Sequence, residues 1–482
     1  MSHASSNMHA PSNQHHKMGT ESAEADQLHV VMFPWFAFGH ISPFVQLSNK
    51  LSLHGVKVSF FSAPGNIPRI KSSLNLTPMA DIIPLQIPHV DGLPPGLDST
   101  SEMTPHMAEL LKQALDLMQP QIKTLLSQLK PHFVFFDFTH YWLPGLVGSQ
   151  LGIKTVNFSV FSAISQAYLV VPARKLNNSL ADLMKSPDGF PATSITSLDE
   201  FVARDYLYVY TKFNGGPSVY ERGIQGVDGC DVLAIKTCNE MEGPYLDFVR
   251  TQFKKPVLLT GPLVNPEPPS GELEERWAKW LCKYPPKSVI YCSFGSETFL
   301  TVDQIKELAI GLEITGLPFF LVLNFPPNVD AQSELVRTLP PGFMDRVKDR
   351  GVVHTGWVQQ QLILRHESVG CYVCHSGFSS VTEAVISDCQ LVLLPLKGDQ
   401  FLNSKLVAGD LKAGVEVNRR DHDGHFGKED IFKAVKTVMV DVNKEPGASI
   451  RANQKWWREF LLNGQIQDKF IADFVKDLKT LA

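Results

Sequence analysis

The sequence predicts an α/β protein with two doubly wound domains, each built on a parallel sheet that is covered by helices on both faces. Short, almost wholly apolar runs alternate with helical patterns along most of the 482 residues, as expected for strands buried on both faces. The alternation stops once, at 262–275, and then starts again. Charged residues make up 19% of the chain and apolar residues 44%, which excludes disordered, collagen-like and coiled-coil proteins.

The first half begins with an apolar run at 28–35 and a helical pattern that extends to Gly55. Ser42 is a suitable N-cap for this helix, Pro43 suits its first position, and Gly55 is a suitable stop. Further strands are expected at 56–63, 132–138, 154–160, 231–237 and 256–262. Together these elements predict an N-terminal domain at 28–261.

The segment 262–275 has four prolines and almost no apolar periodicity, which is typical of an interdomain linker. After it, a helix is expected at 301–315, opened by a capping box between Thr301 and Gln304. The strands of this second half are expected at 288–296, 318–325, 351–357, 370–376 and 390–396. We therefore predict a second domain at 276–450.

The two ends of the chain differ in character. Residues 1–27 lack the apolar core of a secretory signal and are expected to form a disordered leader, whose four histidines have no spacing that would favour a metal site. Residues 451–482 are expected to form amphipathic helices that pack back on the first domain. No run of 18 apolar residues predicts a membrane span, so we expect a cytoplasmic protein.

The cysteines and the net charge indicate the compartment of the protein and exclude some classes of binding partner. Seven scattered cysteines suit a reducing compartment. Cys371 and Cys374 form a C-x-x-C pattern, but they lie in an apolar run, so a buried strand is favoured over a redox pair. The net charge of -5 argues against binding to nucleic acid or to an anionic membrane.

The loop after the first predicted strand has a single glycine, Gly39. A dinucleotide-binding turn needs G-x-G-x-x-G there, so an NAD or FAD site loses its main support. His40 follows directly and precedes a helix, where an imidazole can act as a general base near neutral pH. The alternative is a histidine that only hydrogen-bonds a loop carbonyl.

Asp137 ends a strand that is otherwise apolar, and a buried carboxylate without a partner is costly. A catalytic histidine needs a carboxylate that fixes its tautomer and stabilises the imidazolium. Ligands of such sheets bind beyond the carboxyl ends of the strands, so His40 and Asp137 are predicted to form this pair. The alternative for Asp137 is to cap the next helix.

Two loops of the second half suit a phosphate. SFGSE at 293–297 ends a strand, and HSGFSS at 375–380 ends another strand and opens a helix, whose free N–H groups favour an anion. Neither loop has the P-loop pattern, and the second lacks the nucleophile elbow G-x-S-x-G. DHDG at 421–424 resembles the start of a calcium loop, but Phe432 replaces the required Glu, so a turn is expected.

The segment from Trp357 to Gln400 resembles the donor-binding box of the plant family 1 UDP-sugar glycosyltransferases. The matching positions are Trp357, Gln360, His366, Gly370, His375, Gly377, Ser380, Glu383, Pro395, Asp399 and Gln400. The resemblance extends to the G-H-x-x-P pattern at 39–43, to Asp137 and to SFGS, and so covers essentially the whole chain beyond the leader.

This resemblance implies a GT-B fold, in which the first domain binds the acceptor and the second binds a UDP-sugar across a cleft. It implies that His40 is the base and Asp137 its partner in an inverting transfer without a metal ion, with the UDP-sugar as co-substrate and no cofactor. It also implies a donor site formed by Trp357 at the uracil, Gln360 near the base and ribose, Glu383 at the ribose hydroxyls, Ser296, His375 and Ser380 at the diphosphate, and Asp399 and Gln400 at the sugar, with Gly377 and Ser379 as further donor-binding residues.

The chain departs from the family pattern at Gln359, at Ser379, where asparagine is usual, and at 388–390. These departures resemble the branch that adds a sugar to a sugar already present on a flavonoid. Within it, the whole chain is most similar to flavonoid-glucoside 1,6-rhamnosyltransferases, which implies UDP-rhamnose as donor and the 6-hydroxyl of the glucose as acceptor. Phe378 and Ser379 make the pocket less polar, which suits the C6 methyl group of rhamnose.

An apolar acceptor site is expected around the proposed base, although each of its aromatic residues could equally belong to the core. These residues are Phe36, Phe38, Phe138, Tyr141 and Trp142. Other functions remain open: transfer from UDP-glucose or UDP-xylose to flavonoid glycosides or another small aglycone, UDP-sugar epimerisation, and non-catalytic binding of a nucleotide sugar. The expected partners are a UDP-sugar and a small acceptor such as a flavonoid glycoside, with no nucleic acid and no integral membrane segment.

Overall fold

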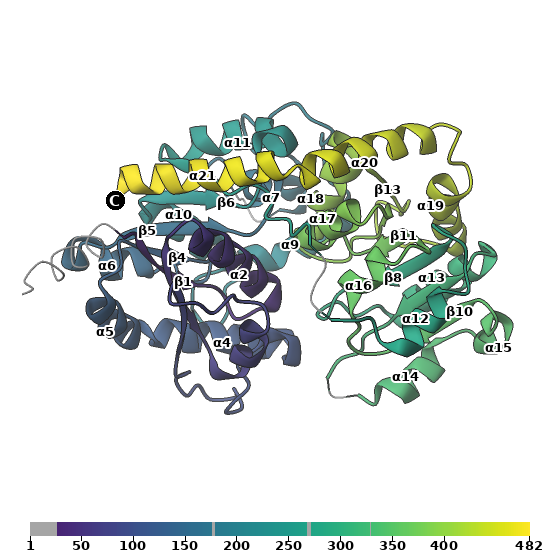
Figure 1. Cartoon of the computed structure of the whole chain (residues 1–482), viewed down its shortest axis with the longest axis horizontal. Coiled ribbons are helices and arrows are strands. Elements are labelled where there is room, and N and C mark those ends of the chain that lie inside the picture. Colours follow the sequence, from purple (N-terminus) through teal and green to yellow (C-terminus); the bar gives the residue numbers. More distant parts are fainter. Residues whose placement is uncertain (1–26, 176–178, 268–270, 328) are drawn as a thin grey trace, which may run out of the picture.

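The computed structural model describes residues 27–175, 179–267, 271–327 and 329–482. Within them the chain forms two lobes that lie side by side, each built on a parallel sheet (Figure 1). The expected leader, apart from its last residue, and part of the expected linker lie outside the described residues. The predictions about disorder and about the leader histidines therefore stay predictions.

The N-terminal lobe contains, in the described part of the chain, a seven-stranded sheet in the order β3-β2-β1-β4-β5-β6-β7. Its strands are β1 (His29–Phe33), β2 (Lys57–Ser62), β3 (Ala80–Pro84), β4 (Phe133–Phe136), β5 (Lys154–Ser159), β6 (Val232–Ile235) and β7 (Val257–Leu259). Neighbouring strands are parallel throughout. The order reverses between β1 and β4, and ligands of doubly wound sheets bind at such a switch point.

Helices pack on both faces of this sheet. In β1, Val30 and Met32 join one apolar core and Val31 and Phe33 join another, so successive side chains are buried on opposite faces. The helices are α2 (Phe38–Leu53), α3 (Ile67–Lys71), α4 (Pro105–Leu117), α5 (Gln119–Leu129), α6 (Leu143–Leu151), α7 (Ala163–Leu169), α8 (Leu180–Met184), α9 (Glu200–Tyr210), α10 (Val219–Gly229) and α11 (Asn239–Phe253), with short turns η1 (Pro64–Asn66) and η2 (Thr100–Glu102).

The second lobe repeats this topology, with the strand order β10-β9-β8-β11-β12-β13 and a switch point between β8 and β11. Its strands are β8 (Val289–Ser293), β9 (Phe319–Val322), β10 (Gly351–His354), β11 (Val369–Cys374), β12 (Gln390–Leu393) and β13 (Gly414–Glu416). Its helices are α12 (Glu275–Leu281), α13 (Val302–Ile314), α14 (Ala331–Thr338), α15 (Phe343–Val347), α16 (Gln360–Arg365), α17 (Phe378–Ile386), α18 (Gln400–Lys405), η3 (Leu406–Asp410) and α19 (Lys428–Met439).

The C-terminal helices α20 (Gly447–Leu462) and α21 (Gly464–Leu481) join the two lobes. Helix α20 packs against α17 of the second lobe, whereas α21 runs along the first lobe (Figure 1). The apolar face of α21 supplies Ile471, Phe474 and Leu478 to the core beneath β1 and β4. The first described strand and the last helix thus lie in the same lobe, and α20 and α21 connect that lobe to the second one.

The lobes also touch directly, beyond the carboxyl ends of their strands. Ser162, next to α7, donates a hydrogen bond to Asn403 of α18 over 2.6 Å. The backbone N–H of Gly398 donates to Asp205 of α9 over 2.8 Å. Each sheet carries the loops that follow its strands at one edge, and these two edges face each other where the lobes meet.

The fold class and the strands expected from apolar runs are confirmed, and so is the capping box of Thr301 and Gln304. The edge strands β3 and β13 were not predicted, because β3 contains Asp and Pro and β13 has only three residues. Cys371 and Cys374 lie buried in β11 and are free, as the strand interpretation predicted. DHDG forms the expected turn.

The start of α2 was predicted incorrectly. The helix begins at Phe38 with Ala37 as its N-cap, so Ser42 does not cap it and Pro43 lies inside it. The chain turns into the helix directly after β1, and the carbonyl of Ala37 accepts hydrogen bonds from the N–H groups of His40 and Ile41. This earlier start places His40 in the first turn of α2.

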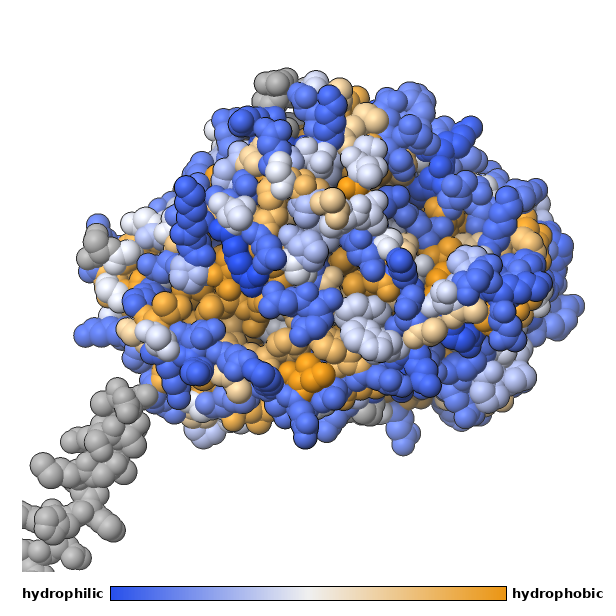
Figure 2. Space-filling view, turned by 90° about the horizontal axis from the view of Figure 1, so that it is seen from above, coloured by the Kyte–Doolittle hydropathy of each residue, from blue (hydrophilic) through white to orange (hydrophobic). Residues whose placement is uncertain are grey.

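Hydrophilic side chains cover much of the face seen from above, and hydrophobic residues show between them (Figure 2). In the described part of the chain, no helix combines the length and apolar character needed to cross a bilayer.

Candidate active site

His40 and Asp137 meet at the switch point of the first sheet. His40 Nδ1 lies 2.7 Å from Asp137 Oδ2, and the two side chains are 15% and 1% exposed. Asp137 also accepts hydrogen bonds from the backbone N–H groups of Trp35 and Phe138. It does not cap the next helix, which begins at Leu143. The carboxylate is therefore held on three sides and directed at the histidine.

The electrostatics of this pair follow from its burial and its contact. Burial lowers the pKa of His40, but the carboxylate of Asp137 opposes this, and the pKa is raised above its ordinary value of 6.5. Burial acts to raise the pKa of Asp137, but His40 outweighs it and the pKa is lowered. An ionised carboxylate can only accept, so His40 Nδ1 carries the hydrogen and Nε2 is left with the lone pair.

A cavity lies beside the pair, with about 680 Å³ of empty space between its walls when the part open to solvent is included. Asp137 and Phe138 line it from the first lobe, and Gly398 and Asp399 line it from the second. Half of its other lining residues have apolar side chains: Phe161, Leu169, Val170, Val209, Val219 and Val227. The candidate base thus lies where an apolar cavity meets the second lobe.

Two polar atoms interrupt the apolar wall. Asn157 Nδ2 and Ser159 Oγ are buried at the end of β5 and line the cavity, and neither has a hydrogen-bond partner in the described part of the chain. A buried polar group without a partner is costly, so both atoms are suited to meet a polar group of a ligand.

The predicted acceptor aromatics are only partly brought together. Phe138 lines the cavity, with its ring centroid 5.5 Å from that of His40. The other four lie outside the cavity lining: Phe36 and Trp142 in the core, Phe38 against the guanidinium of Arg69, and Tyr141 beside Arg222. Sequence reasoning missed Phe161, whose ring is 5.2 Å from that of His40. Its place just after β5 was the available signal.

The second switch point brings the two phosphate-type loops together. His375, after β11, packs against Gly295, after β8, and against Gly377. A Cβ at Gly377 would lie 2.7 Å from His375 Nε2, so this close approach requires glycine. Ser296, in the same loop as Gly295, is exposed.

The backbone here forms an uncapped helix start, a geometry that favours an anion. Ser376 has a left-handed φ of 66°, a conformation that is strained for a residue other than glycine and is often found at functional sites. It directs the chain into α17, whose N-cap, Gly377, offers no side-chain cap to the first N–H groups. Burial lowers the pKa of His375 to about 4, so its ring is neutral, and its Nδ1 has no partner among the described residues.

A cluster of side chains surrounds Glu383, further along α17. Gln360 and Gln361 each donate to one of its carboxylate oxygens, over 3.1 and 2.8 Å. Tyr372 donates to the amide oxygen of Gln360. Burial raises the pKa of Glu383. Trp357, on the loop after β10, is 72% exposed, so its indole is open to a ligand.

Asp399 and Gln400 follow β12. The side-chain oxygen of Gln400 accepts hydrogen bonds from the N–H groups of Leu396 and Lys397, and so holds the loop that carries Asp399. Asp399 accepts from Asn403 over 2.9 Å, and burial raises its pKa. Asp399 also lines the cavity beside Asp137, whereas the side-chain oxygen of Gln400 is occupied by backbone N–H groups.

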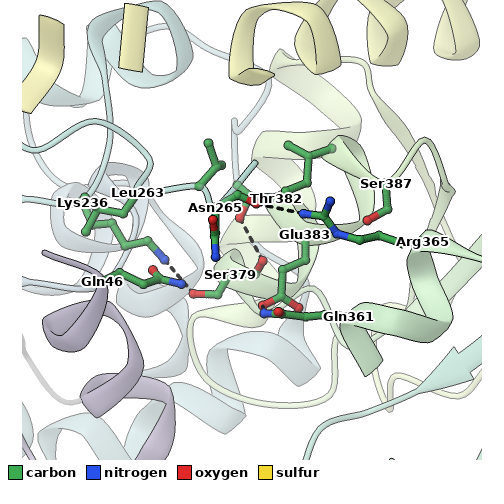
Figure 3. Close-up of a pocket in the computed structure, with 12 residues that line it drawn as sticks. Gln46, Lys236, Leu263, Asn265, Gln361, Arg365, Ser379, Thr382, Glu383 and Ser387 are labelled. Atoms are coloured by element: carbon green, nitrogen blue, oxygen red, sulfur yellow. Dashed lines mark hydrogen bonds between the residues drawn. The ribbon is translucent and has the colours of Figure 1, made fainter. Parts of the chain in front are cut away.

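A residue that the sequence analysis did not single out links the lobes at this point. Lys236, directly after β6, donates from Nζ to Ser379 Oγ over 2.6 Å (Figure 3). Ser380, its neighbour on α17, lies 3.5 Å from the amide nitrogen of Gln360.

Within the described ranges, no cluster of three or more His, Cys, Asp or Glu side chains could hold a metal ion.

Comparison with known proteins places this arrangement in context. The family profile of UDP-glucoronosyl and UDP-glucosyl transferase matches residues 279–447. The chain is similar to anthocyanidin-3-O-glucoside rhamnosyltransferase of Petunia hybrida, at 64% identity over 95% of this chain and 97% of that protein. It is also similar to UDP-glycosyltransferase 79A6 of Glycine max, at 59% identity over 95% and 98%.

Solved structures agree on the fold. The structure of Glycyrrhiza uralensis UGT73P12 complexed with glycyrrhetinic acid 3-O-monoglucuronide matches with a TM-score of 0.75 at 23% identity, over 94% of this chain and 96% of that chain. Together with the two doubly wound sheets, this likeness confirms the expected GT-B fold.

Proposed function

The chain belongs to the plant family 1 UDP-sugar glycosyltransferases, and from this premise we propose that it transfers rhamnose from UDP-rhamnose to the 6-hydroxyl of a glucose carried by a flavonoid. The 64% identical Petunia hybrida relative, named for rhamnose transfer to an anthocyanidin glucoside, supports this choice of donor and acceptor. The observation that carries it is the cavity that brings Asp137, the partner of His40, together with Asp399 of the second lobe.

In the proposed reaction, His40 Nε2 takes the proton of the acceptor hydroxyl. The hydroxyl oxygen then attacks the anomeric carbon of the donor, the bond from that carbon to the β-phosphate oxygen breaks, and UDP leaves with the electron pair. Attack opposite the leaving group inverts the anomeric configuration. Asp137, 2.7 Å from Nδ1, stabilises the imidazolium that forms.

The acceptor is proposed to occupy the apolar cavity. Flat aromatic rings suit its wall of Phe138, Phe161 and aliphatic side chains. The unpartnered atoms of Asn157 and Ser159 would meet hydroxyl groups of the flavonoid. A hydroxylated ring system satisfies both kinds of surface better than a purely apolar molecule does.

The donor is proposed to lie across the second switch point, between Trp357 and Asp399. Glu383 and Gln360 would hold the ribose, and His375, Ser296, Ser380 and the N–H groups of α17 would hold the diphosphate. These groups stabilise the charge of the diphosphate through hydrogen bonds and a helix terminus, so we propose a transfer that needs neither a metal ion nor a cofactor. The seven free cysteines support a reducing compartment, the cytoplasm.

Trp357→Ala is expected to raise the dissociation constant of UDP roughly 5- to 150-fold, because stacking of a base on an aromatic ring contributes about 1–3 kcal/mol. Calorimetric titration with UDP measures this directly. Trp456→Ala, at another exposed tryptophan that lies on α20, is the matched control and should leave UDP affinity unchanged. Unchanged UDP affinity in Trp357→Ala would remove this residue from the donor site.

The proposed function as a whole is tested by incubating a flavonoid monoglucoside with each UDP-sugar in parallel. We expect a product with UDP-rhamnose, joined through the 6-hydroxyl of the glucose.

A further inference from the structure

Two lysines are buried in the described part of the chain, and they differ in their partners. Lys112 is paired with the carboxylate of Glu109 over 2.6 Å. Lys236 is 1% exposed and forms no ion pair in the described part of the chain; its ammonium donates to the neutral hydroxyl of Ser379. A buried charge without a counter-charge is costly, so the site of Lys236 is incomplete without an anion.

The surroundings of Lys236 do not supply that anion. The carboxylate of Glu383 acts to raise the pKa of Lys236, but it already accepts hydrogen bonds from two glutamine side chains. Burial lowers the pKa of the lysine only to about 8, so the ammonium is mostly protonated at neutral pH. Gln46 of α2 lines the same pocket, and its side-chain oxygen is buried without a partner among the described residues.

The position of Lys236 points to the ligand. The residue follows β6, at the carboxyl edge of the first sheet, and reaches across to the first turn of α17 (Figure 3). The uncapped N–H groups of that turn carry the positive end of the helix dipole. The ammonium of Lys236 and the N-terminus of α17 thus lie close together. Both carry positive charge, so they repel each other and together favour the binding of an anion.

We propose that Lys236 binds the diphosphate of the UDP-sugar and so contributes a donor-binding cation from the acceptor lobe. This inference rests on the proposed function and adds to it a residue outside the donor-binding box. As the bond to the anomeric carbon breaks, negative charge grows on the β-phosphate, and the ammonium stabilises it. Binding of the donor would then also tie the two lobes together through this side chain.

The test compares ligands with and without phosphate groups. Lys236→Met is expected to raise the dissociation constant of UDP roughly 10- to 100-fold, the range for losing a hydrogen bond to a charged group, while that of uridine changes less than about 2-fold. Lys236→Arg should restore most of the UDP affinity. Lys112→Met, which removes the other buried lysine, should leave both affinities unchanged. Calorimetry serves for UDP and NMR titration for uridine.

A merely structural lysine would give a different pattern. If Lys236 only held the lobes together, Lys236→Met would weaken UDP and uridine equally, and this result, like unchanged UDP affinity, would overturn the proposal. If Lys236→Met does not fold, Lys236→Gln, which can still donate to Ser379, carries the same comparison. Absence of UDP binding in the unmodified protein would instead contradict the proposed function.

Discussion

His40→Ala is expected to lower turnover at least ~100-fold, the low end of what a general base contributes. The acceptor hydroxyl is a poor nucleophile until its proton is removed, and the imidazole held by Asp137 lies beside the cavity proposed for the acceptor. UDP affinity should stay unchanged, because His40 is not among the residues proposed to bind UDP. Initial rates at saturating donor and acceptor, together with UDP calorimetry, measure both effects.

His54→Ala is the matched control, because His54 lies exposed at the other end of the same helix. It should leave turnover unchanged. Full activity of His40→Ala would remove His40 from the mechanism. An absolute requirement for Mg²⁺, revealed by loss of activity with EDTA, would contradict the proposed metal-independent transfer.

Asp137→Asn is expected to lower turnover roughly 10²- to 10⁴-fold, as in a catalytic triad whose orienting carboxylate is replaced by an amide. The amide has almost the same shape but carries no charge, so it neither fixes the tautomer of His40 nor stabilises the imidazolium. The variant should fold, because its side-chain oxygen can still accept from the backbone N–H of Phe138. Asp247→Asn, at an exposed carboxylate, is the control.

The pH dependence gives a second signature of the same pair. His40 acts as a base only when neutral, so turnover should fall as the pH drops below its pKa, which Asp137 holds above the ordinary value. Without the carboxylate, burial lowers the pKa of His40, so in Asp137→Asn the acidic fall of the residual activity should move to lower pH. A shift to higher pH, or none, would contradict the pairing.

Much of this architecture could be predicted from the sequence, because parallel strands buried on both faces leave long apolar runs. The pair of His40 and Asp137 could be predicted for a related reason. Each residue follows a central strand, and the strand order 3-2-1-4 places the ends of β1 and β4 side by side. The pair could therefore be predicted from the position of each residue at the end of a strand together with the usual strand order of such sheets.

Other features depend on contacts between distant segments, which no local pattern encodes. Lys236 and Ser379 are 143 positions apart, and their contact exists only because the two lobes meet. Phe36 and Phe161 are both aromatic residues after strands, yet one is buried in the core and the other lines the cavity. Which side a loop residue faces is decided by tertiary packing.

The most direct test of the proposed function is a matrix of UDP-rhamnose, UDP-glucose and UDP-xylose against flavonoid 3-O-glucosides and the corresponding free flavonoids, with the purified full chain. We expect the highest kcat/KM with UDP-rhamnose and a glucoside, little activity on the free flavonoid, and a product joined through the 6-hydroxyl of the glucose by NMR. A clear preference for UDP-glucose or UDP-xylose, for the free flavonoid, or for the 2-hydroxyl would contradict this assignment.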